Sequence, residues 1–226
     1  MAQSSSKIRV FIADDHFVVR QGLRHTLTQH SDIEIVGEAE DGNQVLERIK
    51  DLEVDVVLLD IEMPKKNGWE VMIQLKSLYP KLNVLMLSIF SEEHYGLRLI
   101  KSGASGYLTK SSAPDQLCQA IRTVASGGKF ISPSLTEKLI EELHNDTSKL
   151  QHEQLSTREF QVFCLIASGK RTKEIAEELS VSITTISTHR ANILEKMGLK
   201  NSTDLIHYAL KNGFINEGPT PNIKPS

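Results

Sequence analysis

The pattern of hydrophobic positions changes along the chain. Over the first 130 residues, short apolar runs rich in β-branched residues alternate with stretches in which apolar residues recur every three or four positions. The runs predict strands at 8–13, 33–37, 55–59, 83–88 and 105–108, and the periodic stretches predict helices at 18–29, 43–50, 69–78, 92–101 and 114–126. Because the strands are apolar on both sides, we expect a doubly wound α/β domain with a five-stranded parallel sheet.

The rest of the chain carries helical signals and no strand. Residues 133–143 fit one acidic helix, and a polar stretch follows it. A second domain of four helices is expected next. Its first helix begins at the capping-box pair Ser156 and Glu159, and its last two end at Gly198 and Gly213. The expected divisions are 7–128 for the first domain, 129–154 for a linker with a helix, 155–215 for the all-α domain and 216–226 for a disordered, proline-containing tail.

Composition and charge narrow the classes of protein that fit. The net charge is −3, and residues 151–226 hold nine Lys and Arg against eight Asp and Glu, so DNA binding there would need a local cluster of cations. No apolar run approaches the ~20 residues of a membrane-spanning helix, and no export signal is seen at the start. We therefore expect a cytoplasmic protein without membrane contact. Cys118 and Cys164 lie in apolar helical patterns and are expected to be buried, reduced thiols.

Charged residues follow three of the expected strands. Asp14 and Asp15 come after the first strand, Asp60 ends the third, and Lys110 lies beyond the fifth. Since the carboxyl ends of parallel strands meet at one edge of the sheet, these side chains are expected to converge. Carboxylates held close together repel unless a cation is present, and oxygen ligands suit Mg²⁺. For any one aspartate taken alone, a solvated loop carboxylate or a helix cap is the simpler interpretation.

Residues 7–128 resemble the receiver domain of two-component response regulators. The resemblance rests on four pieces: the acidic pair Asp14-Asp15, the D-x-x-M-P-x-x-x-G stretch at 60–68, Ser88 at a strand end, and the stretch 106–110. It implies a flavodoxin-like fold in which Asp60 accepts phosphate from a cognate sensor histidine kinase. It also implies that Mg²⁺ is held by Asp15, Asp60 and the backbone carbonyl of Glu62, with Asp14 bound through water.

The same resemblance implies a switch. Lys110 would contact the phosphoryl oxygens, Ser88 would hydrogen-bond the phosphate, and Tyr107 would turn into the space that the Ser88 loop vacates. A strand-end hydroxyl and an ordinary aromatic side chain are the structural alternatives for Ser88 and Tyr107. The protein would then be no enzyme beyond its own Mg²⁺-dependent phosphorylation and dephosphorylation.

The second and third helices of the last domain, within 172–197, fit a helix-turn-helix. Periodicity turns one side of the third helix toward the core, through Ile186, Ile193, Leu194 and Met197. Small and hydroxyl-bearing side chains on the other side would let the helix 182–197 sit deep in a major groove. The residues expected to contact DNA are Lys170, Arg171, Lys173, Thr184, Thr185, Ser187, Thr188, Arg190, Ala191 and Lys196. On these features alone, a protein-docking module fits as well.

The last domain resembles the LuxR-type DNA-binding domain in the stretches 155–159, 173–176, 185–190 and 196–199. Residues 7–215 as a whole therefore resemble a NarL/FixJ-type response regulator. The resemblance implies a transcription regulator that forms a homodimer when phosphorylated or bound to DNA. One residue departs from the family: Ser187 stands where a lysine is often found, and with Glu195 nearby the groove-facing side is weak in charge.

Two other functions fit parts of the sequence. The carboxylates and the lysine suit a Mg²⁺-dependent phosphohydrolase with an aspartyl-phosphate intermediate, although no substrate cap or further acid–base residue is evident. Alternatively, the helical domain would bind protein or RNA instead of duplex DNA. Steady turnover of phosphate esters would favour the first, and failure to enrich any duplex sequence would favour the second.

Overall fold

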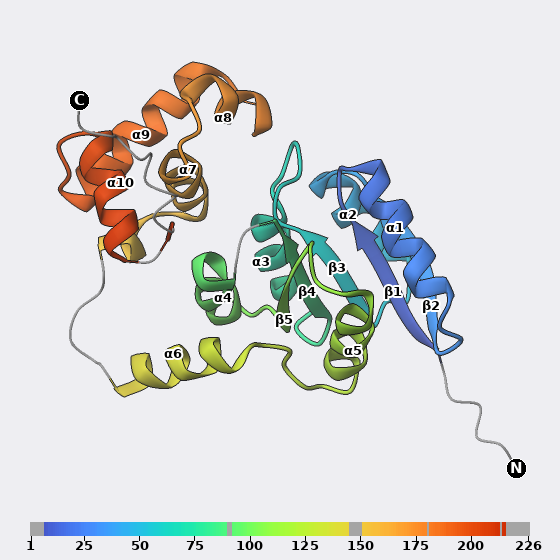
Figure 1. Cartoon of the computed structure of the whole chain (residues 1–226). Helices are drawn as coiled ribbons and strands as arrows, with labels where there is room; N and C mark the ends of the chain where they lie inside the picture. Colours follow the sequence, from blue (N-terminus) through green and yellow to red (C-terminus); the bar gives the residue numbers. More distant parts are fainter. Residues whose placement is uncertain (1–6, 90–91, 145–150, 180, 213, 216–226) are drawn as a thin grey trace, which may run out of the picture. The chain divides into compact units, whose positions relative to one another are not determined.

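The computed structural model describes residues 7–89, 92–144, 151–179, 181–212 and 214–215 (Figure 1). The chain divides into two compact units, Met1–Asp146 and Thr147–Ser226. The expected tail at 216–226 and Gly213, the expected end of the last helix, lie outside the described residues. None of the helices described is both long enough and apolar enough to span a membrane.

The first unit is built on a five-stranded parallel sheet. Its strands are β1 (Ile8–Ala13), β2 (Ile33–Ala39), β3 (Val56–Asp60), β4 (Asn83–Ser88) and β5 (Gly106–Thr109). They lie in the order β2-β1-β3-β4-β5, and every pair is parallel. The expected doubly wound sheet is confirmed. The strand order reverses between β1 and β3, which places a crevice at their carboxyl ends.

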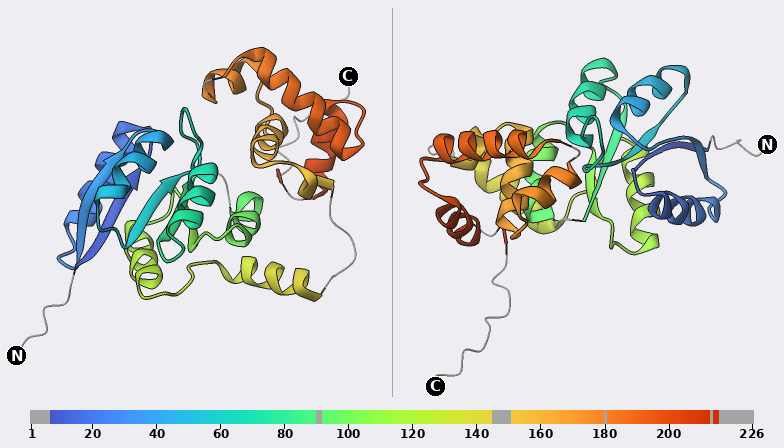
Figure 2. Two further views of the ribbon diagram at one scale, coloured as in Figure 1. Left: turned by 180° about the vertical axis from the view of Figure 1, so that it is seen from behind. Right: turned by 90° about the horizontal axis from the view of Figure 1, so that it is seen from above.

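Helices cover both faces of this sheet (Figure 2). Helices α1 (Phe17–Thr28) and α5 (Pro114–Ala125) pack on one face, where Leu27 and Ile121 join Val10, Leu58 and Leu85 in a buried core. On the other face lie α2 (Gly42–Arg48), which continues as a short 3-10 turn (Ile49–Asp51), and α3 (Gly68–Leu78). Helix α4 (Glu92–Lys101) packs beside β5.

The segment after α5 departs from the expected linker because its first part belongs to the first unit. Phe130 extends the sheet at its edge: its carbonyl accepts from the Tyr107 N–H at 3.1 Å, and its own N–H donates to Ser105 at 3.0 Å. Helix α6 (Pro133–His144) then packs against α4, with Leu135 buried. The chain that leads out of this unit is thus bound to the edge of its sheet.

The second unit is all helical. A 3-10 turn (Gln151–Gln154) precedes α7 (Thr157–Ala167), α8 (Thr172–Glu178), α9 (Ile183–Met197) and α10 (Ser202–Lys211). The caps follow the sequence: Ser156 and Glu159 form the expected capping box, and the Ser182 side chain accepts from the Thr185 N–H. Gly198 ends α9 in the left-handed region, with φ of 64°, a conformation that glycine adopts without strain.

An aromatic cluster forms the core of this unit. The rings of Phe160, Phe163 and Phe214 pack edge to face or stacked, with centroids 5.2–5.8 Å apart. The His152 ring joins them, and its Nδ1 hydrogen-bonds the Tyr208 hydroxyl at 2.9 Å. Cys118 and Cys164 are both buried, as expected.

Candidate functional site

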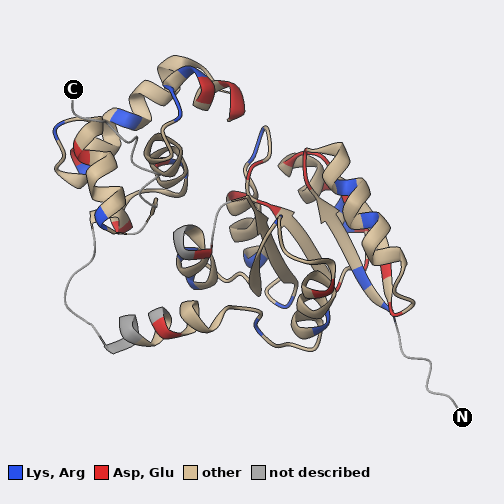
Figure 3. Cartoon of the chain, in the orientation of Figure 1, with Lys and Arg blue, Asp and Glu red and all other residues tan. Residues whose placement is uncertain are grey.

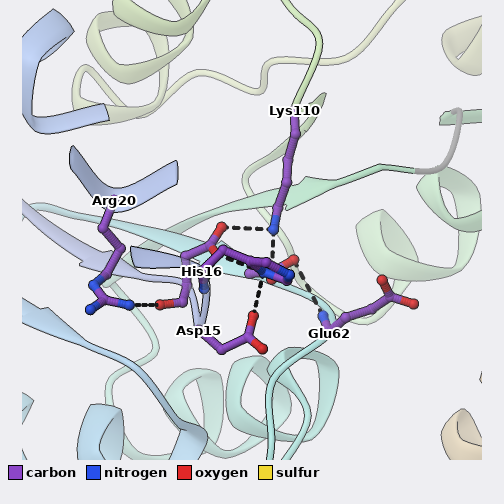
Figure 4. A network of polar contacts seen from close by, with 7 residues as sticks. Asp15, His16, Arg20, Glu62 and Lys110 are labelled. Carbon is purple, nitrogen blue, oxygen red and sulfur yellow. Dashed lines mark hydrogen bonds and ion pairs between the residues drawn. The ribbon is translucent and has the colours of Figure 1, made fainter. Parts of the chain in front are cut away.

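The expected acidic residues meet at the carboxyl ends of β1, β3 and β5 (Figure 4). The Lys110 Nζ lies 2.7 Å from Asp14 Oδ2 and 2.7 Å from Asp60 Oδ2. Both carboxylates are almost fully buried, at 0% and 1% exposure, whereas Asp15 beside them is one-third exposed. The structure therefore places one ammonium between two buried carboxylates, with a third carboxylate at the mouth of the pocket.

This pocket carries more negative than positive charge when its carboxylates are ionised. Burial, and then the charge of Asp14, raise the pKa of Asp60 to about 8, although Lys110 and the Glu62 N–H act in the opposite direction. Burial lowers the pKa of Lys110, but the attraction of Asp60 and the hydrogen bonds to both carboxylates outweigh it, so the net shift is upward. Negative charge therefore exceeds positive charge when all three carboxylates ionise. A hard divalent cation bound by carboxylate oxygens would restore the balance.

His16 is a member of this cluster that the sequence analysis did not single out. Its Nδ1 lies 2.7 Å from Asp15 Oδ1 and 3.4 Å from Asp14 Oδ1. One ligand atom from each of Asp14, Asp15, His16 and Asp60 falls within 4.8 Å of the others. The only sequence signal was its position directly after the acidic pair. The imidazole of His16 contacts the Asp15 carboxylate. A cation that binds Asp15 must therefore share this carboxylate with His16 or displace the imidazole ring.

The loop after β3 fixes the position of Asp60. The Glu62 N–H donates to Asp60 Oδ1 at 3.3 Å, and the Gly68 N–H donates to the Ile61 carbonyl at 2.9 Å, so the loop folds back on its own start. A Cβ at Gly68 would lie 1.7 Å from the Asp60 carbonyl oxygen. Only glycine allows this approach of two backbone segments. The glycine of the D-x-x-M-P-x-x-x-G stretch is thus explained by the return of the loop.

Gly68→Ala is expected to lower the free energy of unfolding by roughly 1–3 kcal/mol, because the methyl group must push the loop away from Asp60. Gly22→Ala is the matched control. Gly22 is a residue of helix α1, and a Cβ added there would have no other atom within 4 Å. That control should be neutral or stabilising by up to about 1 kcal/mol. Urea unfolding compares the two variants. Equal stability of Gly68→Ala and wild type would contradict the close approach.

Asp60→Asn is expected to stabilise the folded protein in metal-free buffer, more at pH 8 than at pH 5. The pKa of Asp60 is about 8 in the folded protein, above the ~3.9 of an exposed carboxyl. The folded state therefore binds the extra proton, and wild-type stability falls as the pH rises across that interval. Asparagine is uncharged at both values, so we expect a gain on the order of 1–3 kcal/mol at pH 8. Urea unfolding at both pH values measures it, and a gain that is larger at pH 5 would refute it.

The two expected switch residues lie on the neighbouring strands β4 and β5. Ser88 ends β4 and is buried, and its carbonyl accepts from the Lys110 N–H at 2.7 Å. Tyr107 lies in β5 and is buried. Its N–H is the one that pairs with Phe130, so the backbone of Tyr107 joins the sheet to the segment that leads into α6.

In the second unit, most of the α9 residues that are expected to contact DNA are exposed. Ile186, Ile193 and Met197 are buried and Leu194 is half-buried, as periodicity predicts. The exposed residues of this helix include Thr184, Ser187, Thr188, Arg190 and Ala191. Thr185 is half-buried, and its hydroxyl lies 2.8 Å from that of Ser182.

Two of the expected DNA-contacting lysines are held by carboxylates of the same unit. Lys196 Nζ lies 2.7 Å from Glu159, the capping-box residue of α7, and Lys170 Nζ lies 2.6 Å from Glu178. Figure 3 shows acidic residues beside the basic ones around α8. Arg171, Lys173 and Arg190 are exposed, and Lys173 has only a long contact of 3.9 Å with Glu177. Cations are therefore sparse on this surface.

Comparison with protein families assigns a model to each unit. Residues 10–122 match the response regulator receiver domain, and residues 153–209 match the bacterial regulatory proteins of the luxR family. The chain is 35% identical to the transcriptional regulatory protein DegU of Brevibacillus brevis, over 94% of this chain and 97% of that protein. It is 36% identical to the oxygen regulatory protein NreC of Staphylococcus aureus, over 92% and 99%.

Solved structures give the same likeness. The response regulator RcsB of Salmonella typhimurium is 27% identical, with a TM-score of 0.65 over 92% of this chain and 98% of that one. RcsB of Salmonella enterica serovar Typhimurium, bound to the promoter P1flhDC in the presence of the phosphomimetic BeF3⁻, is 27% identical, with a TM-score of 0.62 over 90% and 98%. Both likenesses span the two units of the chain.

Proposed function

Because the chain belongs to the response regulators in which a receiver domain precedes a LuxR-type DNA-binding domain, we propose that a phosphoryl group on Asp60 controls the binding of DNA by helix α9. The family makes the protein a DNA-binding regulator of transcription. The observation that carries the residue assignment is the pocket in which Lys110 lies 2.7 Å from both Asp14 and Asp60.

Asp60 is the nucleophile in this proposal, and a sensor histidine kinase is the donor. An Oδ of Asp60 forms a bond to phosphorus while the bond between phosphorus and the imidazole nitrogen of the donor breaks, and the electron pair stays on that nitrogen. Lys110 already donates to Asp60 Oδ2 and offsets charge on the oxygens that arrive with the phosphoryl group. The Glu62 N–H on Oδ1 holds the carboxylate in one orientation. Asp60 thus has a fixed position and a cation beside it.

The donor set also fits Mg²⁺. Asp15 and Asp60, with the backbone carbonyl of Glu62, would hold the ion, and Asp14 would act through water. When bound, Mg²⁺ supplies positive charge against the phosphoryl oxygens. The cluster holds three carboxylates, and one ammonium lies beside two of them, which leaves the negative charge that such an ion would neutralise. His16 Nδ1, which lies 2.7 Å from Asp15 Oδ1, would share that carboxylate with the ion or move away from it.

The conformational change caused by phosphorylation would be transmitted from the pocket through β5. We assign the Ser88 hydroxyl as a donor to the phosphoryl oxygens and Tyr107 as the residue that fills the space behind it. Tyr107 is hydrogen-bonded through its backbone to Phe130, and α6 follows directly. A shift of β5 would therefore move the segment that leads to the second unit.

DNA binding would combine α9 in the major groove with phosphate contacts around it. Arg171, Lys173 and Arg190 remain available to phosphates, whereas Lys170 and Lys196 must first leave Glu178 and Glu159. One solved structure of the relative RcsB contains two dimers bound to two parallel DNAs. We infer that this chain also binds as a homodimer, with two copies of α9 on two half-sites.

A selection from a random duplex library tests this function. The full-length protein, incubated with Mg²⁺ and acetyl phosphate, is expected to enrich a motif with two related half-sites. Thr188→Glu places a carboxylate on the exposed face of α9 and should enrich none, whereas Gln119→Glu adds the same charge on exposed α5 and should enrich the wild-type motif. Failure of the wild-type protein to enrich any duplex would reject DNA binding and favour a protein or RNA partner.

A further inference from the structure

We propose that the exposed face of α9 recognises A·T base pairs through the 5-methyl groups of thymine, and not guanines through charged side chains. The inference rests on the proposed function, because it takes α9 to lie in the major groove. There, thymine presents a methyl group, adenine and cytosine each present an amino donor, and guanine presents two acceptors that need donors from the protein. The chemistry of the α9 face therefore decides which base pairs it can read.

Apolar groups are exposed at the start of α9, the end that meets base edges in a helix-turn-helix, and again two turns further on. Ile183 is the first residue of the helix and is 52% exposed, although it is a large aliphatic side chain. Ala191, two turns further on, is also exposed. The exposed methyl groups of these side chains match the surface that a thymine methyl group offers.

Two hydroxyls of this face, those of Ser187 and Thr188, donate to the backbone of the helix itself. Ser187 Oγ donates to the Ile183 carbonyl at 3.0 Å, and Thr188 Oγ1 donates to the Thr184 carbonyl at 3.0 Å. Each of these two oxygens therefore offers lone pairs, which suit the amino group of adenine or cytosine and not the acceptors of guanine. The thymine methyl group is then the feature that selects an A·T pair. The methyl group of exposed Thr188 adds to the apolar surface.

Lysine and arginine are absent from the first two turns of α9. Within α9, all 15 residues of which are described, the cations are Arg190 and Lys196. Arg190 lies on the same side of the helix as Ile183 but two turns further from its start, and Lys196 is tied to Glu159 at 2.7 Å. Ser187 occupies the position where the family often carries a lysine. A bidentate contact to guanine therefore has no charged donor in the first two turns, which meet base edges in a helix-turn-helix.

Replacement of thymine by uracil tests the inference, since it removes the methyl group and keeps every hydrogen bond of the base pair. The full-length protein with Mg²⁺ and acetyl phosphate is bound to its selected duplex, and thymines are replaced one at a time. At two or more positions per half-site the dissociation constant should rise about fourfold, the effect of one buried methyl-sized group. Uracils outside the half-sites should have no effect.

Ile183→Ala connects the effect to the protein. Ile183 is half-exposed, so the variant should fold, and the uracil penalty should disappear at the position that Ile183 contacts. Ile73→Ala removes an exposed isoleucine from α3 of the other unit and should leave every penalty unchanged. A duplex that binds tightly but shows no uracil penalty, or a selected motif made of G·C pairs, would overturn the inference and leave the proposed function intact. Binding to no duplex would reject both.

Discussion

In the presence of Mg²⁺, Asp60→Asn is expected to take up a phosphoryl group from acetyl phosphate at a rate at least about three orders of magnitude below that of the wild type. The amide has nearly the shape of the carboxylate but is a far weaker nucleophile. Asp14 also lies 2.7 Å from Lys110, but its Oδ1 accepts from the His16 N–H, and Asp15 Oδ1 lies 2.7 Å from the His16 ring. Asp60 is the carboxylate that both Lys110 and the Glu62 N–H hold. Intact-protein mass spectrometry measures the gain of one phosphoryl group.

The control for this prediction is Asp115→Asn. Asp115 is an exposed carboxylate in the first turn of α5, in the same unit but outside the pocket. This variant should gain the phosphoryl group as fast as the wild type. If Asp60→Asn gained the same mass at a comparable rate, another side chain would be the acceptor, and the assignment of Asp60 would be wrong.

Lys110→Met is expected to lower the free energy of unfolding by about 3–5 kcal/mol at pH 8 in metal-free buffer. The substitution leaves Asp14 and Asp60, both at most 1% exposed, without the ammonium that lies 2.7 Å from each. The loss should be smaller at pH 6. There Asp60, whose pKa is about 8 with Lys110 present and higher without it, takes up a proton and removes one of the two charges. Urea unfolding at the two pH values measures both effects.

A double-mutant cycle isolates the interaction. In the Asp60→Asn background, Lys110 neutralises only Asp14, so Lys110→Met should cost less than it does in the wild type. Lys76→Met serves as the matched control, because Lys76 Nζ donates to the backbone carbonyls of Pro80 and Leu82, outside the pocket. Its cost should be the same in both backgrounds. Strict additivity of Asp60→Asn and Lys110→Met would show that the two side chains do not interact.

Features that depend on local pattern were predictable from the sequence. The strands follow from apolar runs of the right length. The starts of α7 and α9 follow from Ser156 and Ser182, whose side chains act on N–H groups three residues away. The convergence of Asp14, Asp60 and Lys110 was also accessible, because parallel strands bring their carboxyl ends together whatever the loops between them do.

Features that depend on contacts between distant residues were not predictable. The pairing of Phe130 with the edge of β5 involves residues more than 20 positions apart and leaves no periodicity in 129–132, so the sequence predicts a linker there. The ion pair between Lys196 and Glu159 joins residues 37 positions apart. It engages a lysine that the sequence predicts to contact DNA. The contact of His16 with Asp15 is set by the side-chain rotamer, which the order of residues does not reveal.

The affinity of the full-length protein for its selected duplex, before and after phosphorylation, tests the central claim most directly. If a phosphoryl group on Asp60 controls α9, acetyl phosphate and Mg²⁺ should tighten wild-type binding by about 10-fold or more, within the usual range of coupling between two sites. Asp60→Asn should bind the duplex with one unchanged affinity under both conditions. Equal affinities of phosphorylated and unphosphorylated wild-type protein would contradict the account.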